Sequence, residues 1–67
     1  MLKQYLVDIR PVEESQKLEL EDKLSILSFI FSRDLKHPGV YEVFWDFDSD
    51  LSEETFIPSS CIITRIS

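Results

Sequence analysis

Three aspartates at alternate positions, Asp46, Asp48 and Asp50, are the residues of this 67-residue chain whose spacing best suits metal chemistry. The spacing matches the opening of an EF-hand loop, which also needs a glycine at the sixth position and a glutamate at the twelfth. Leu51 and Ile57 stand at those two positions. We therefore expect only weak cation binding by clustered carboxylates, and we predict no metal site and no cofactor.

Nucleophilic catalysis has few candidate residues. Cys61 and His37 are the only cysteine and the only histidine of the chain, and they are far apart in the sequence. A cysteine in a strand is typically a buried, inert thiol, and a histidine beside Pro38 belongs to a turn. The counts exclude a zinc site built from cysteine and histidine, and with Gly39 as the only glycine there is no glycine-rich phosphate loop. We predict that the protein is not an enzyme.

A strand at residues 40–48 must position the acidic side chains. Apolar and acidic residues alternate along it, with Tyr41, Val43, Trp45 and Phe47 on one side and Glu42, Asp46 and Asp48 on the other. This alternation is typical of a strand with one buried face. The apolar side should anchor the core, and the acidic side should face water or a partner.

A first strand is predicted at residues 1–9, with Tyr5, Val7 and Ile9 facing the core, because Pro11 cannot continue a strand ladder. A helix should follow, beginning between residues 12 and 15 and ending at residue 33 or 35. Its core stripe would consist of Leu20, Leu24, Leu27, Phe31 and Leu35.

Two apolar residues of the predicted helix, Ile26 and Phe29, fall outside the core stripe. They have two interpretations. A neighbouring loop could cover them, or they could form a second apolar surface for a dimer or a partner protein, since large exposed apolar patches usually mark interfaces.

The rest of the chain predicts a turn at Pro38 and Gly39, a polar loop at residues 49–55 with one helical turn capped by Ser49 or Asp50, and a last strand at residues 61–66. The fold class is therefore α+β in the order β-α-β-β, a single domain spanning residues 1–67. We expect a three-stranded mixed sheet with one long helix on one face, its first two strands parallel. Such a fold is a truncated ferredoxin-like, or split β-α-β, arrangement.

A strand that ends in an acid, here Asp8, followed by a helix and an aromatic strand, is similar to the start of small ferredoxin-like ribonucleases of the CRISPR-associated kind. The resemblance implies an alternative function, a metal-dependent ribonuclease with Asp8 near the metal. Asp8 is as readily a solvent-facing residue at a strand end, and we assign it no catalytic role.

The net charge of −6 is concentrated in the second half of the chain. Residues 1–40 carry six Lys or Arg and seven Asp or Glu, whereas residues 41–67 carry one and six. Nucleic acid binding requires basic residues against the phosphates. A basic protein surface is therefore the expected partner, and direct binding to nucleic acid is not expected.

The acidic face predicted to bind this partner consists of Glu42, Phe44, Asp46, Asp48, Asp50, Glu53 and Glu54. Carboxylates two positions apart on a strand lie about 6.5–7 Å apart, a spacing comparable to that of DNA phosphates. We expect a small inhibitor of phage type that mimics nucleic acid and occupies the basic surface of a nucleic-acid-handling protein. The other interpretation of the acids is a solvated face that keeps the protein soluble.

An assembly or regulatory subunit that binds, or forms a homodimer, through Ile26 and Phe29 is the second functional hypothesis. A cytoplasmic, soluble protein that binds no membrane is expected in either case. No apolar run approaches the 18 residues of a membrane span, no leader pattern is present, and one cysteine cannot form an internal disulfide.

Overall fold

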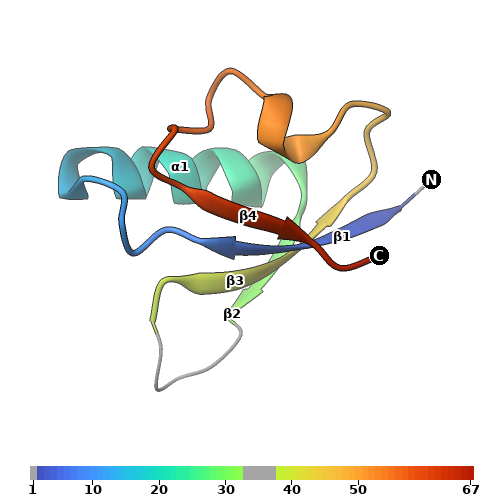
Figure 1. Ribbon diagram of the computed structural model, residues 1–67, viewed down its shortest axis with the longest axis horizontal. Coiled ribbons are helices and arrows are strands. Elements are labelled where there is room, and N and C mark those ends of the chain that lie inside the picture. The colour runs from blue at the N-terminus through green and yellow to red at the C-terminus, as the bar shows by residue number, and fades with distance from the viewer. Residues whose placement is uncertain (1, 33–37) are drawn as a thin grey trace.

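The computed structural model describes residues 2–32 and 38–67. Within them, one α-helix packs on one face of a four-stranded antiparallel sheet (Figure 1). The elements are β1 (Lys3–Asp8), α1 (Glu14–Leu27), β2 (Phe29–Ser32), β3 (Val40–Trp45), the short 3-10 helix η1 (Leu51–Glu53) and β4 (Ile62–Arg65). The predicted α+β class is confirmed, but the sheet has four strands rather than three.

The strands lie in the order β2-β3-β1-β4, and each neighbouring pair is antiparallel. Because β3 is antiparallel to both β1 and β2, the two strands that α1 joins run in the same direction with β3 between them. This arrangement is a split β-α-β unit. The prediction of a mixed sheet, with β1 parallel to the strand beside it, is wrong because α1 leads to β2 and not to β3.

The helix ends earlier than predicted, at Leu27. Ser28 closes it, because both its backbone N–H and its Oγ donate to the carbonyl oxygen of Leu24, at 2.9 Å and 2.6 Å. Leu20 and Leu24 are buried as expected, but Leu27 at the last turn is 38% exposed. The core stripe of the helix is therefore only two residues long in the described part of the chain.

The strand β2 occupies positions that were predicted to be helical. Phe29, Ile30 and Phe31 are of the aromatic and β-branched types that favour strands, and each pairs with a residue of β3. Ile30 packs against the core, whereas Phe31 is 56% exposed. The prediction of Phe31 as a core residue of the helix is wrong, and Leu35 lies outside the described residues.

The core lies between α1 and the sheet, and its buried side chains are Tyr5, Val7, Ile9, Val12, Leu20, Leu24, Val43, Trp45 and Leu51. The predicted core face of β1 is confirmed, as is that of β3 at Val43 and Trp45. Phe47 is 45% exposed because β3 ends at Trp45, and its ring lies against that of Trp45 at a centroid distance of 4.6 Å.

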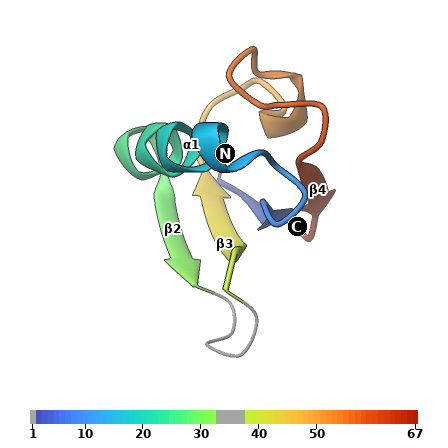
Figure 2. The same cartoon turned by 90° about the vertical axis from the view of Figure 1, so that its left-hand side faces the viewer.

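The segment of residues 46–61 covers the part of the sheet that α1 leaves free, over β1 and β4 (Figure 2). Leu51, at the start of η1, is fully buried in the core. The indole Nε1 of Trp45 donates to the carbonyl oxygen of Ser49 at 3.0 Å. This segment therefore stands on the same face of the sheet as α1 and completes its cover.

Pro38 and Gly39 form the predicted turn before β3. Gly39 has a φ of +101°, which disfavours any residue with a side chain, and a Cβ there would lie 2.9 Å from Cγ of Arg10. Its carbonyl oxygen accepts from the backbone N–H of Ile9 at 2.8 Å. This hydrogen bond ties the turn before β3 to the backbone just after β1.

Candidate protein-binding surface

The face of the sheet opposite α1 has no element packed on it within the described part of the chain (Figures 1 and 2). We call it the open sheet face. The strand register assigns ten side chains to it, namely Gln4, Leu6, Asp8, Phe29, Phe31, Val40, Glu42, Phe44, Ile62 and Thr64. Six of these side chains are apolar, two are acidic and none is Lys or Arg, so the face combines an apolar surface with negative charge.

Three phenylalanines form one patch on the open sheet face. Phe29 pairs in register with Phe44 across β2 and β3. The ring of Phe31 meets that of Phe44 edge to face, with centroids 5.8 Å apart and an interplanar angle of 81°. Phe29 and Phe31 are 73% and 56% exposed. The strand pairing thus joins Phe44, predicted on the acidic face, to Phe29, predicted on the helix.

Glu42 lies in the middle of the open sheet face. It pairs in register with Phe31 of β2 on one side and with Leu6 of β1 on the other. The side-chain amide of Gln4 donates to Oε1 of Glu42. A carboxylate therefore lies directly beside the phenylalanine patch. The strand that carries it, β3, is paired with β1 on one side and with β2 on the other.

The other residues of the predicted acidic face do not continue this strand. β3 ends at Trp45, so Asp46 and Asp48 lie on the exposed segment that follows it. The predicted row of carboxylates at strand spacing through Asp48 is therefore wrong. Glu53 is exposed on η1, and Glu54 accepts from Oγ of Ser49 at 2.6 Å.

Asp50 is the N-cap of η1, in line with the predicted capped helical turn. Its Oδ1 accepts from the backbone N–H and the Oγ of Ser52, at 3.0 Å and 2.8 Å, and from the hydroxyl of Tyr5 at 3.4 Å. The hydrogen bond from the Ser52 side chain is the main cause that lowers the pKa of Asp50 below its ordinary value. Asp50 is thus engaged in holding the loop.

Lys3 links the start of β1 to the acidic loop, a contact that the sequence pattern did not indicate. Its ammonium donates to the backbone carbonyls of Phe47, Asp48 and Ser49, at 2.6 Å, 3.1 Å and 2.9 Å. The loop after β3 therefore wraps a positive charge with its own backbone oxygens.

Asp8 is held by Arg10 at the end of β1. Its two carboxylate oxygens accept from Nε and Nη2 of Arg10, at 2.9 Å and 2.7 Å, and these bonds lower the pKa of Asp8. Within residues 2–32 and 38–67, no three His, Cys, Asp or Glu side chains come together in a way that could hold a metal ion. Metal-dependent ribonuclease activity stays an untested alternative, which loss of RNA cleavage in Asp8→Asn would support and absence of cleavage across divalent metals would rule out.

Cys61 is half-buried just before β4. Burial, with a smaller contribution from the charge of Asp8, raises the pKa of its thiol to about 11. Such a thiol is a poor nucleophile near neutral pH. His37, the other residue considered for nucleophilic catalysis, lies outside the described residues.

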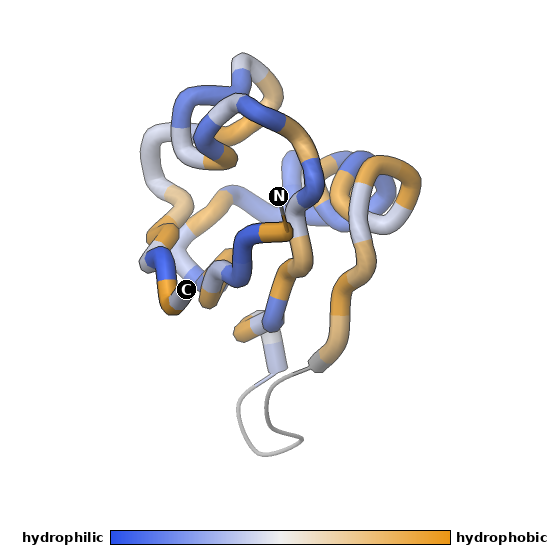
Figure 3. Tube along the Cα trace, turned by 90° about the vertical axis from the view of Figure 1, so that its right-hand side faces the viewer, coloured by the Kyte–Doolittle hydropathy of each residue, from blue (hydrophilic) through white to orange (hydrophobic). Residues whose placement is uncertain are grey.

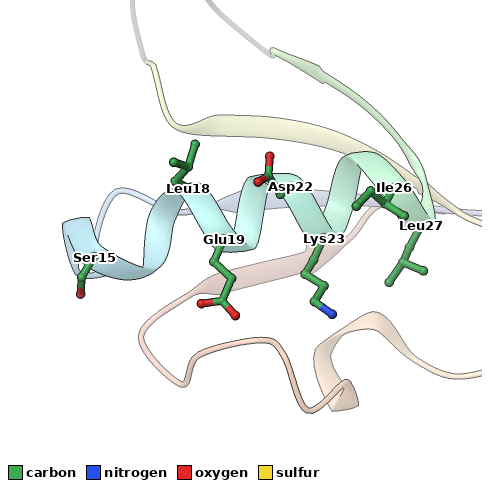
Figure 4. Close-up of a pocket in the computed structure, with 7 residues that line it drawn as sticks. All are labelled: Ser15, Leu18, Glu19, Asp22, Lys23, Ile26 and Leu27. Atoms are coloured by element: carbon green, nitrogen blue, oxygen red, sulfur yellow. The ribbon is translucent and has the colours of Figure 1, made fainter.

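The outer side of α1 carries a shallow hollow with exposed apolar side chains (Figure 4). Leu18 is 71% exposed and Ile26 is 78% exposed. Asp22 points from the helix on the same side as these two residues. Ile26 therefore lies on the helix side of the sheet and Phe29 on the open sheet face, so the two residues do not form one surface.

No helix among the described residues has the length and apolar character needed to cross a membrane. Comparison of the chain with protein-family models, with curated proteins and with solved structures found no match.

Proposed function

We propose that this chain is a non-enzymatic binding protein that acts by docking on the basic surface of a larger, nucleic-acid-handling protein. The open sheet face carries the proposal, because it presents the phenylalanine patch beside Glu42 and no Lys or Arg among its described residues. Exposed apolar patches of this kind mark interaction sites. The concrete form is a phage-type inhibitor that covers a nucleic-acid-binding groove.

The charge of the surface favours a protein over a nucleic acid. Four-stranded sheets with exposed aromatic side chains also bind single-stranded RNA, by stacking on the bases. That mode needs basic side chains along the phosphates. Among its described side chains, the open sheet face has no Lys or Arg and two acids, of which Asp8 is ion-paired with Arg10, and the chain carries a net charge of −6. The phosphate backbone is therefore repelled, whereas a basic protein is attracted.

The acidic loop that follows β3 supports this proposal because it attracts a basic partner electrostatically, without having to contact it. Six acids lie between Glu42 and Glu54 with no basic residue among them. The ammonium of Lys3, which this loop holds, offsets one of these charges, and the remaining negative field raises the rate at which a basic partner arrives. Glu42 is the member of this set that also lies on the open sheet face.

A truncated ferredoxin-like fold is the structural part of the proposal. The strand order and the split β-α-β unit support it. In such a fold the segment of residues 46–61 stands where a second helix would lie, so the cover of one face is complete and the other face is free for a partner.

Capture from a lysate of the native host tests the function. The tagged protein is incubated with lysate treated with nuclease and is washed at low and at high salt. We expect one basic nucleic-acid-handling protein that is retained at low salt and elutes at high salt. Glu42→Lys should weaken its capture more than Asp48→Lys, because Glu42 lies on the docking face. Capture that is equally strong in high salt and in Glu42→Lys contradicts the proposal.

An assembly or regulatory subunit is the second candidate, and the exposure of Leu18 and Ile26 on α1 favours it. This function predicts a complex or homodimer that resists salt and dissociates in Ile26→Asp. Size-exclusion chromatography of the captured complex measures this directly, and a complex unaffected by Ile26→Asp rules the second candidate out.

A further inference from the structure

The strand β2 is an edge of the sheet that contains no charged residue and no proline to protect it. It pairs with β3 alone among the described strands. Natural edge strands are blunted by charged residues, proline, bulges or short length. The four residues Phe29–Ser32 include no charge and no proline, and Figure 3 shows hydrophobic colour along most of this strand. Shortness alone limits what can pair with β2.

The other edge strand, β4, differs from β2 in these respects. It also has four residues, but it ends in Arg65, and three of its four side chains are exposed. Its exposed apolar residue on the open sheet face is Ile62, at 54%. The two edges thus offer a natural comparison, because Ile62 and Phe31 are exposed to the same extent on the same face.

We propose that β2 accepts an extended, basic segment of the partner protein as a fifth strand of the sheet. Strand addition of this kind uses backbone hydrogen bonds for affinity and alternate side chains for specificity. The inference rests on the proposed function and names the element of the chain that the partner engages. It requires a partner segment in which basic and apolar residues alternate.

Charge complementarity selects this occupant. Side chains of an added strand that point to the open sheet face lie beside Phe29 and Phe31, with Glu42 one strand further in. The long stem of an arginine covers an aromatic ring, and its guanidinium is attracted both by the ring face and by a carboxylate. The register places no Lys or Arg on this face among the described residues, and the neighbouring Arg10 is already paired with Asp8.

A second copy of the chain fits the same edge less well. Each copy carries a net charge of −6, and pairing two β2 strands brings the two Glu42 side chains onto one continuous face. Such a contact is self-complementary in shape but repulsive in charge. The basic segment of a different protein is therefore the occupant that the observations favour.

The first test uses a synthetic peptide in which arginine and valine alternate, followed by NMR on the labelled full chain. Phe31→Lys places a charge at the edge of β2 and should weaken binding roughly tenfold or more. Ile62→Lys is the matched control at the other edge and should leave affinity within about twofold of the unmodified chain. The amide spectrum of each variant confirms that it is folded.

A peptide in which glutamate replaces arginine should bind the unmodified chain far more weakly than the arginine peptide does. In Glu42→Lys, the two peptides should differ less in affinity. Glu53→Lys, which changes an exposed acid on η1, is the control for net charge. Equal binding of both peptides, or equal loss in Phe31→Lys and Ile62→Lys, overturns strand addition at β2.

Hydrogen exchange separates this inference from the proposed function. When the captured partner is bound, strand addition predicts slower exchange of the backbone amides of β2, with β4 unchanged. If a basic partner is captured and β2 exchange does not change, the proposed function stands and strand addition is refuted. If no basic partner is captured and the arginine peptide does not bind, both are refuted.

Discussion

Single residues decide which surfaces of this protein are free for binding. Phe29 and Phe31 stay 73% and 56% exposed, whereas Ile30 between them packs against the core. Glu42 alternates in the same way with the buried Val43. The open sheet face therefore arises from strand alternation alone, and a change of one residue in register would bury its phenylalanines and expose the core.

The thiol of Cys61 should be unreactive in the folded protein. Its pKa is raised from 9.0 to about 11, so two pKa units separate it from an ordinary thiol and the thiolate fraction near neutral pH falls by about 100-fold. We expect slow alkylation by iodoacetamide, which accelerates strongly in urea. Equal rates in the folded and unfolded states would show that the thiol is not buried in solution.

Asp50 should stabilise the fold only where it is ionised. Its folded pKa is lowered, so its contribution is complete above the ordinary pKa of an aspartate and is lost as pH falls through the folded value. Asp50→Ala should therefore lower the urea midpoint at neutral pH, and this deficit should shrink as the pH falls through the lowered pKa of the folded state. Asp50→Asn keeps a neutral acceptor and is the control. A deficit that does not change with pH contradicts this role.

At the scale of elements, β2 decides how the sheet is built. Because Ile30 lies on the core face and Phe31 on the open sheet face, Ile30→Ala should destabilise by about 1–3 kcal/mol and Phe31→Ala by about 1 kcal/mol or less. If these positions were helical, Phe31 would face the core, and Phe31→Ala would destabilise the protein more than Ile30→Ala. Urea denaturation of the two variants measures the difference.

The turn before β3 depends on its glycine. Gly39→Ala should destabilise by about 1–2 kcal/mol, because φ is +101° and the new Cβ would crowd Arg10. Ser59→Ala, an exposed loop substitution, should change the free energy of unfolding by less than about 0.5 kcal/mol. Similar free energies of unfolding for the two variants would contradict the geometry of the turn.

Local patterns predicted part of these elements. Alternation placed the core face of β1 and the start of β3 correctly, and Pro38 and Gly39 marked the turn. The mostly apolar run from Leu24 to Phe31 is compatible with a helix, and Ser25 and Ser28 are its only polar residues. The consecutive residues Phe29, Ile30 and Phe31 favour a strand, but the helix prediction included them.

Two features could not be predicted because they depend on contacts distant in sequence. The register of Phe29 with Phe44 follows from the pairing of β2 with β3, which no local pattern specifies. Leu51 lies within a polar loop, and its burial depends on the segment folding back over the sheet. The sequence therefore predicts only part of the candidate site. It places Glu42 and Phe44 on the binding face, but it assigns Phe29 and Phe31 to the helix.

At the scale of the whole molecule, the chain has the accessible surface of a folded monomer. Its accessible surface is 4600 Å², close to the roughly 4,400 Å² expected for a folded monomer of this mass. The apolar patch on the open sheet face is thus an addition to an already compact protein. A partner that binds there should be released by salt without unfolding the chain.

The most direct test of the central claim compares two phenylalanine variants in the capture experiment. Phe44→Ser removes the centre of the patch on the open sheet face, whereas Phe47→Ser removes an exposed ring beyond the end of β3. The account predicts that Phe44→Ser loses the basic partner and that Phe47→Ser retains it, with both variants folded by circular dichroism. Retention of the partner by folded Phe44→Ser would show that the open sheet face is not the binding surface.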